Sequence, residues 1–215
     1  MKVYAHYFKD EVSKNDYRWR TLLQFGTSWN IIGSVVMKNP GSAAPLKQVE
    51  EGCLLDNLSG FSKEYEWFEF SVDNTMRCIE SLFRSYYQHN VSDSELNGVI
   101  QIFNLMNVRD PNLNQAIIRN KKSFYAFSVT IDKDIANMVA PIYLGWGKLG
   151  FSSMFADNAK LVFEKTVEKF DGQYLNAKFE NNLFYHPQYL MGRGKNKSQS
   201  RQLLNAFCQN SQSPK

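Results

Sequence analysis

Four short segments of the chain are almost continuously apolar and end in turn-forming residues. Runs of this kind are typical of strands that are covered on both faces of a sheet. They predict buried strands at residues 30–37, 98–103, 141–144 and 182–185. Two further stretches, residues 66–70 and 124–131, could add strands or strand-like edges.

Apolar residues at helical spacing fill the segments between these strands. Residues 72–87 carry an apolar side chain at every third or fourth position, and Ser71 or Asp73 is available as the N-cap. Further helices are predicted at residues 112–120, 132–138, 157–170 and 198–208. Strands that alternate with helices imply right-handed crossovers and a parallel sheet. The predicted fold class is therefore α/β, a three-layer α/β/α sandwich around a central, mainly parallel sheet of roughly four to five strands.

Length and composition favour one globular domain, predicted at residues 1–208 with a frayed tail at residues 209–215. Hydrophobic residues make up 43% of the 215 residues and aromatic residues 14%, enough for a substantial core. The arm at residues 3–25 is rich in aromatic side chains. It could cover the core or form a dimer surface, and core cover is the favoured interpretation.

The cellular compartment is predicted from absent signals and from the cysteines. No apolar run approaches about 18 residues, so we expect no membrane span. A basic stretch followed by an apolar one is missing from the N-terminus, so we expect no signal peptide. Cys53, Cys78 and Cys208 are widely spaced, which favours reduced thiols in a cytoplasmic protein.

Polar residues follow the predicted strands where a ligand would bind. In open α/β sheets the ligand crevice lies beyond the carboxyl ends of the strands. The first strand ends in Asn39-Pro40-Gly41-Ser42, a preset turn that would hold the Asn39 amide at the crevice, or else an ordinary connection. The second ends at Asn104, whose amide either caps backbone groups, the favoured interpretation, or contacts a ligand.

The residues after Asn104 and at the end of the third strand suggest packing roles. Arg109 and Asp110 precede Pro111 and could form a local ion pair that fixes the loop. Trp146 lies between two glycines at the end of the third strand. An indole in that position more often fills a gap in the core than binds a ligand.

The end of the fourth strand combines a histidine, an apolar loop and a run of cations. His186 is followed by Tyr189-Leu190-Met191 and then by four cations, namely Arg193, Lys195, Lys197 and Arg201. The cations are typical either of a solvated loop or of a phosphate-binding edge. An apolar loop tip beside cations is what a minor-groove wedge with phosphate clamps requires.

Taken in order, these four strand ends resemble the motifs of the uracil-DNA glycosylase superfamily, across residues 31–207. The resemblance implies that superfamily's fold, with Asn39 positioning the attacking water and Asn104 hydrogen-bonding the base edge. It also implies that His186 stabilises the departing base and that Leu190 fills the vacated stack. Contacts to the substrate are implied for the residues of the first and third motifs, namely Pro40, Gly41, Ser42 and Trp146.

The chain departs from that superfamily at several positions. Gly41 replaces the tyrosine that narrows the pocket of the uracil enzymes, and Asn39 replaces the aspartate that activates water. Tyr189 replaces the second proline of the fourth motif. The aromatic residue that stacks on the base has Phe61 as its nearest candidate.

The chain resembles a bacterial family of unknown function more closely than it resembles that superfamily. The similar residues are Tyr17-Arg18 through Leu22, Asn39 to Ala43, Asn104-Leu105, Arg109 to Pro111 and Trp146-Gly147. That family implies no activity.

Three functions follow as hypotheses. The first is hydrolysis of the N-glycosidic bond of a flipped base in DNA. The second is a non-catalytic module that binds nucleic acid or a nucleotide, and the third is an enzyme acting on another small molecule. The net charge of +4 permits a DNA partner without demanding one. Glycine-rich nucleotide loops and zinc-ligand spacing are missing, so we expect no cofactor and no metal.

Overall fold

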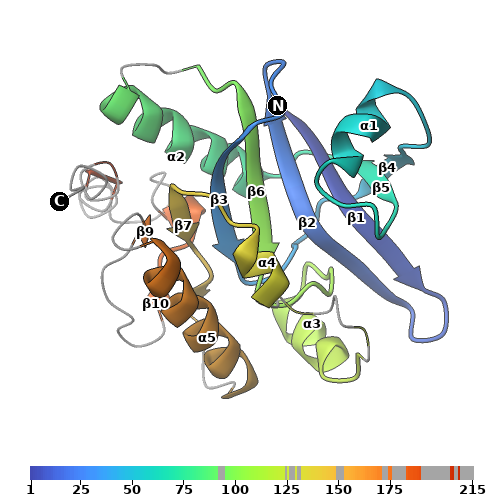
Figure 1. Cartoon of the computed structure of the whole chain (residues 1–215). Helices are drawn as coiled ribbons and strands as arrows, with labels where there is room; N and C mark the ends of the chain where they lie inside the picture. The colour runs from blue at the N-terminus through green and yellow to red at the C-terminus, as the bar shows by residue number, and fades with distance from the viewer. Residues whose placement is uncertain are drawn as a thin grey trace.

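The computed structural model describes residues 1–91, 95–123, 125, 129, 132–148, 153–170, 174–175, 183–189, 204–205 and 208. Within them, one mixed sheet has eight strands in the order β4-β5-β1-β2-β6-β3-β7-β9 (Figure 1). These strands are β1 (Lys2–Asp10), β2 (Asn15–Phe25), β3 (Ile31–Met37), β4 (Pro45–Gln48), β5 (Trp67–Phe70), β6 (Gly98–Asn104), β7 (Ile142–Leu144) and β9 (Tyr174–Leu175). A separate two-stranded sheet pairs β8 (Gly147–Lys148) with β10 (Leu183–Phe184).

The predicted fold class, with a mainly parallel sheet of four to five strands, is wrong. Strands β6, β3, β7 and β9 are parallel, but β2 pairs antiparallel with β6, and β1, β5 and β4 continue that antiparallel half. The aromatic arm predicted to cover the core is instead the β1–β2 hairpin at the middle of the sheet. The fourth predicted strand contains β10, which pairs with β8 and not with the main sheet.

A β-bulge in this hairpin sets which side chains face which side. Tyr4 pairs with Leu22 and His6 pairs with Trp19, so β2 has one extra residue between these partners. Arg20 lies in the bulge with a φ of 46°, a left-handed conformation that is uncommon for a residue other than glycine. Because side chains alternate along a strand, Arg18 and Trp19 face opposite sides of the sheet.

Helices pack on both faces of the sheet (Figure 1). α2 (Asn74–Val91) covers one face, where Met76, Ile79 and Phe83 pack against β3 and β6. The other face is covered by α3 (Leu113–Asn120), α4 (Asp132–Ala136) and α5 (Ser153–Phe170), with α1 (Cys53–Ser59) over β1 and β2. No helix in the described part of the chain combines the length and the apolar character needed to cross a bilayer.

Capping residues fix where two of these helices begin. The Asp73 carboxylate accepts a hydrogen bond from the Met76 N–H at 2.9 Å, which caps α2. The Asn112 side chain accepts from the backbone N–H groups of Asn114 and Gln115, which caps α3. The cap of α2 lies beside the ends of β3 and β6, because Asp73 lines one cavity with Met37 and Asn104.

Candidate functional site

The parallel strands β3 and β6 end side by side at a small polar cavity, here called the strand-end pocket. Met37 at the end of β3 pairs in register with Asn104 at the end of β6. The cavity has a volume of about 110 Å³, and its polar lining consists of Arg18, Asn39, Asp73, Thr75, Asn104 and His186. Pro40 and Gly41 also line it. Asn39, Asn104 and His186, which were predicted because they follow predicted strands, all line this cavity, although the strand before His186 is β10, which lies outside the main sheet.

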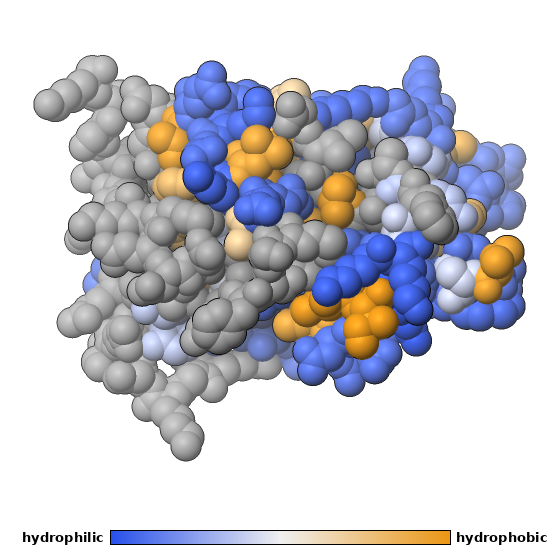
Figure 2. All heavy atoms as spheres, turned by 90° about the horizontal axis from the view of Figure 1, so that it is seen from below, coloured by the Kyte–Doolittle hydropathy of each residue, from blue (hydrophilic) through white to orange (hydrophobic). Residues whose placement is uncertain are grey.

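A shallower hollow adjoins the strand-end pocket. It has a volume of about 500 Å³, shares Gly41, Asp73 and Thr75 with the pocket, and continues to Ser42 and Gln188. Figure 2 views the molecule from the end toward which β3 and β6 run, where the described surface is mostly hydrophilic with smaller apolar areas. A ligand larger than the pocket could therefore extend into this hollow.

Arg18 places a buried positive charge in the wall of the pocket. Its side chain is 4% exposed, and its Nη2 donates to the carbonyl oxygen of Pro40. The Nε and Nη1 atoms are buried without a hydrogen-bond partner. Burial lowers the pKa of the guanidinium to about 10, an effect opposed by Asp73 and reinforced by Arg109. Arg18 stays charged at neutral pH, so its field favours a ligand that carries or develops negative charge in the pocket.

Asp73, which the sequence predicts only as a possible helix cap, supplies a carboxylate to the pocket. One oxygen, Oδ1, accepts the Met76 N–H. The other, Oδ2, lies 3.9 Å from the position that a β-carbon would occupy at Gly41. Gly41 has a φ of 70° and no side chain, so the turn can pass close to this carboxylate. Oδ2 is therefore the oxygen that is left for a water or a ligand.

His186 is held as a neutral imidazole with its proton on Nε2. Burial lowers its pKa, the charge of Lys38 lowers it further, and Asp73 acts in the opposite direction. The Gln188 backbone N–H donates to His186 Nδ1 at 3.3 Å, so Nδ1 is the acceptor nitrogen. The Gln188 side chain in turn donates to Thr75 Oγ1 at 3.2 Å and ties this segment to α2. The free donor of His186 is its Nε2–H.

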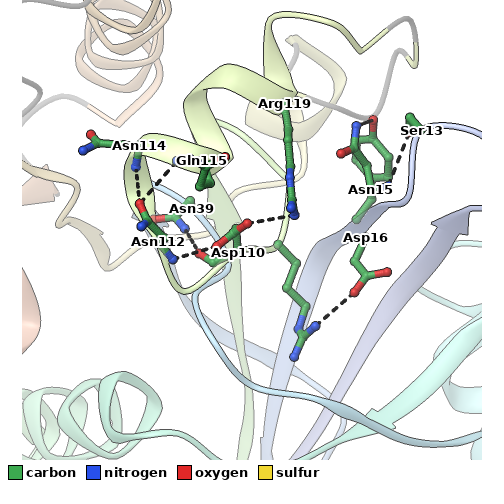
Figure 3. Close-up of polar contacts among 11 residues, drawn as sticks. Ser13, Asn15, Asp16, Asn39, Asp110, Asn112, Asn114, Gln115 and Arg119 are labelled. Atoms are coloured by element: carbon green, nitrogen blue, oxygen red, sulfur yellow. Dashed lines mark hydrogen bonds and ion pairs between the residues drawn. The ribbon is translucent and has the colours of Figure 1, made fainter.

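The two asparagines are each held by their amide nitrogen. Asn39 Nδ2 donates to the carbonyl oxygen of Asp110 at 3.2 Å, and Figure 3 shows this contact from the side of α3. The Asp110 carboxylate accepts the Asn112 N–H at 2.7 Å and pairs with Arg119 at 2.8 Å. Asn104 is 1% exposed, and its Nδ2 lies 3.4 Å from Asn107 Oδ1. Hydrogen bonds thus fix the orientation of both carboxamides at the pocket.

Arg109 fastens the turn that follows β3. It donates to the carbonyl oxygens of Ala43 at 2.6 Å and Ser42 at 3.0 Å, and it pairs with Asp16 at 3.2 Å. The predicted ion pair between Arg109 and Asp110 is wrong, because each of them pairs with a residue elsewhere in the chain.

The remaining predicted site residues either lie away from the strand-end pocket or fall outside the described residues. Trp146 is 1% exposed and packs edge-on against Phe184 at 4.7 Å, within the core beneath α5. Phe61 lines a different cavity. The predicted DNA contacts Leu190, Arg193, Lys195, Lys197 and Arg201 lie outside the described residues. Across the part of the chain that is described, no three His, Cys, Asp or Glu side chains are grouped to hold a metal ion.

Comparison of the chain with protein-family models finds no match, and comparisons with curated proteins and with solved structures find no significant similarity. The chemistry of the pocket is therefore the basis for assigning a function.

Proposed function

We propose that the strand-end pocket is a hydrolytic site that binds a nucleobase and cleaves its N-glycosidic bond. The observation that carries the proposal is that a carboxylate, two carboxamides, an imidazole and a buried guanidinium line one cavity. A flipped base in DNA is the substrate that the resemblance of the strand-end motifs implies. In that case the base would enter the pocket and the sugar would lie in the adjoining hollow.

Each polar group has a role in such a reaction. Asp73 Oδ2 accepts a proton from a water molecule that the Asn39 carboxamide helps to orient. The water oxygen bonds to the anomeric carbon, the bond from that carbon to the base nitrogen breaks, and its electron pair stays on the base. Arg18 and the His186 Nε2–H stabilise the negative charge that develops on the base. Asn104 hydrogen-bonds the base edge, and the released base takes a proton from solvent.

A second candidate function is binding of a nucleotide without catalysis. One observation favours it. Among the described residues, the pocket is lined by no Phe, Tyr or Trp that would stack on a flipped base and hold it in position for catalysis.

Base release by the full chain tests both candidates. The substrates are single-stranded and duplex oligonucleotides that carry uracil, mismatched thymine or hypoxanthine. Asp73→Asn removes the carboxylate while keeping the α2 cap, since Asn caps helices as well as Asp does. We expect this variant to lower release by about 100-fold. The matched control is Asp157→Asn on the exposed side of α5, which should leave release unchanged.

Each outcome distinguishes the candidates. Release that depends on Asp73 and is unaffected in the control supports hydrolysis. Absence of release, with binding of the same oligonucleotides that weakens as salt is raised, supports the non-catalytic function. Absence of both release and binding refutes both.

A further inference from the structure

A second cavity, here called the aromatic pocket, lies on the opposite face of β2. It has a volume of about 370 Å³, which falls in the usual range of about 300–1,000 Å³ for small-molecule sites. Its lining comes from β1, β2, the segment before β5, and α4. Since Arg18 faces the strand-end pocket and Trp19 and Arg20 line the aromatic pocket, β2 forms a wall of both.

Aromatic rings make up one side of this pocket. The Trp19 and Tyr65 ring centroids lie 4.9 Å apart at 81°, and the His6 ring lies 5.7 Å from Tyr65. Trp19 is 7% exposed whereas Tyr65 is 41% exposed, so the Tyr65 side is open to solvent. Phe61 adds a further ring to the lining. A flat ring is the shape of ligand that packs well against such a surface.

Two polar atoms of the lining residues lack hydrogen-bond partners. Arg20 Nε is buried without a partner, and so is His6 Nε2. His6 Nδ1 lies 3.0 Å from the carbonyl oxygen of Glu66 and must donate to it, so Nε2 carries the lone pair. Buried polar groups without partners are costly, and ligand atoms that pair with them relieve the cost. Both atoms belong to residues that line the aromatic pocket but are themselves closed to solvent, so a ligand in the cavity would pair with them only after these side chains shift.

The backbone at Arg20 is an independent sign of a site. Arg20 takes a left-handed φ of 46° in the β-bulge of β2. Strained residues and bulges of this kind concentrate at binding sites, where they redirect a side chain. Here the bulge adds Arg20 to the same cavity as its neighbour Trp19, although side chains next to each other in a regular strand face opposite sides.

The charges at the aromatic pocket favour an anion. Its cations are Arg20, Lys63 and Lys133, and its anions are Glu64 and Asp134, which leaves one positive charge in excess. Lys133 and Glu64 form an ion pair between α4 and the segment before β5. We infer that the aromatic pocket is a second ligand site, which takes a small molecule with a planar ring and an anionic group.

Calorimetric titration of the full chain tests the inference. The probes are indole-3-acetate and uridine monophosphate, which each carry a ring and an anionic group. The halves of the first are 3-methylindole and acetate, and the halves of the second are uridine and phosphate. We expect one of the complete probes to bind about tenfold more tightly than either half. That probe should bind about tenfold more weakly to Arg20→Gln and to Tyr65→Leu. Tyr65 is partly exposed, so its replacement should leave the fold intact.

Two control variants separate this site from the strand-end pocket. Arg84→Gln removes a guanidinium on α2, which covers the other face of the sheet, and should leave binding unchanged. Asp73→Asn, which alters the strand-end pocket, should also leave it unchanged. The inference is overturned if the halves bind as tightly as the complete probes, or if Arg20→Gln and Tyr65→Leu bind normally. Loss of binding in Asp73→Asn instead would assign the ligand to the strand-end pocket and would also overturn it.

Discussion

The stability of the protein should fall in mild acid because His6 is buried as a neutral imidazole. Its side chain is 1% exposed, and its ring lies 3.9 Å from that of Trp67. Burial lowers its pKa from 6.5 to about 4, although the hydrogen bond to Glu66 opposes that shift. Below pH 6.5 the unfolded chain binds a proton at this residue that the folded chain does not bind. The free energy of unfolding is therefore not reduced by His6 above that pH, and it declines as the pH falls toward 4.

The size of the effect follows from the gap between the two pKa values. At about 1.4 kcal/mol per pKa unit, the gap corresponds to about 3 kcal/mol once the pH reaches the folded pKa. Most of this loss has already occurred before the falling pH reaches the folded pKa, and at about pH 5 it amounts to about 2 kcal/mol. The two states bind nearly equal numbers of protons at about pH 7.5, so the loss of stability caused by His6 is close to zero there.

Urea unfolding at these two pH values measures the effect. His6→Asn removes the titrating ring and keeps an amide N–H near the position of Nδ1, so the bond to Glu66 can persist. We expect wild type to lose about 2 kcal/mol more than His6→Asn between about pH 7.5 and about pH 5. His89→Asn at the exposed end of α2 is the matched control and should behave as wild type does. Equal pH dependence in wild type and His6→Asn would refute the reasoning.

Three substitutions test the packing and capping contacts, each measured by urea unfolding. Gly33→Ala would bring a β-carbon within 2.3 Å of the Phe83 ring and should destabilise the fold by about 1–3 kcal/mol. Asn112→Ala removes the α3 cap and should cost about 1 kcal/mol, whereas Asn112→Asp should restore most of it. Arg109→Met leaves the carbonyl oxygens of residues 42–43 unpaired and should cost about 2 kcal/mol. Arg109→Lys should recover only part of this, because one ammonium cannot replace the guanidinium fork. Unchanged stability in any of the three would contradict the contact concerned.

The sequence predicted the parallel strands near the site because their residues are continuously apolar. β3, β6 and β7 all fall on predicted strands, and α2 and α3 fall on predicted helices. The hairpin was missed because β2 interrupts its apolar residues with Arg18, Thr21 and Gln24, which are nevertheless buried. A rule that recognises buried strands by apolar runs cannot detect a strand whose buried side chains include polar ones.

Only part of the candidate site was predicted, because the prediction depended on the same recognition of strands by apolar runs. Asn39, Asn104 and His186 follow predicted strands, so the strand-end rule selected them. Arg18 lies in the strand that was missed, and its only signal was the resemblance around Tyr17-Arg18. The sequence predicts Asp73 only as a helix cap, which is a frequent role for aspartate. That role uses one carboxylate oxygen and does not indicate that the second oxygen faces a pocket.

The central place of the hairpin has a consequence for how the chain folds as it is synthesised. β1 and β2 adjoin in sequence and can pair early, but the next partner of β2 is β6, where Thr21 pairs with Ile102. β3 likewise waits for both of its neighbours, β6 and β7. Long-range pairings of this kind slow folding and leave strand edges unpaired during translation. The growing chain thus exposes an edge of β2 until β6 leaves the ribosome, and an edge of β3 until β7 does. In that interval these edges are open to chaperones and to other nascent chains.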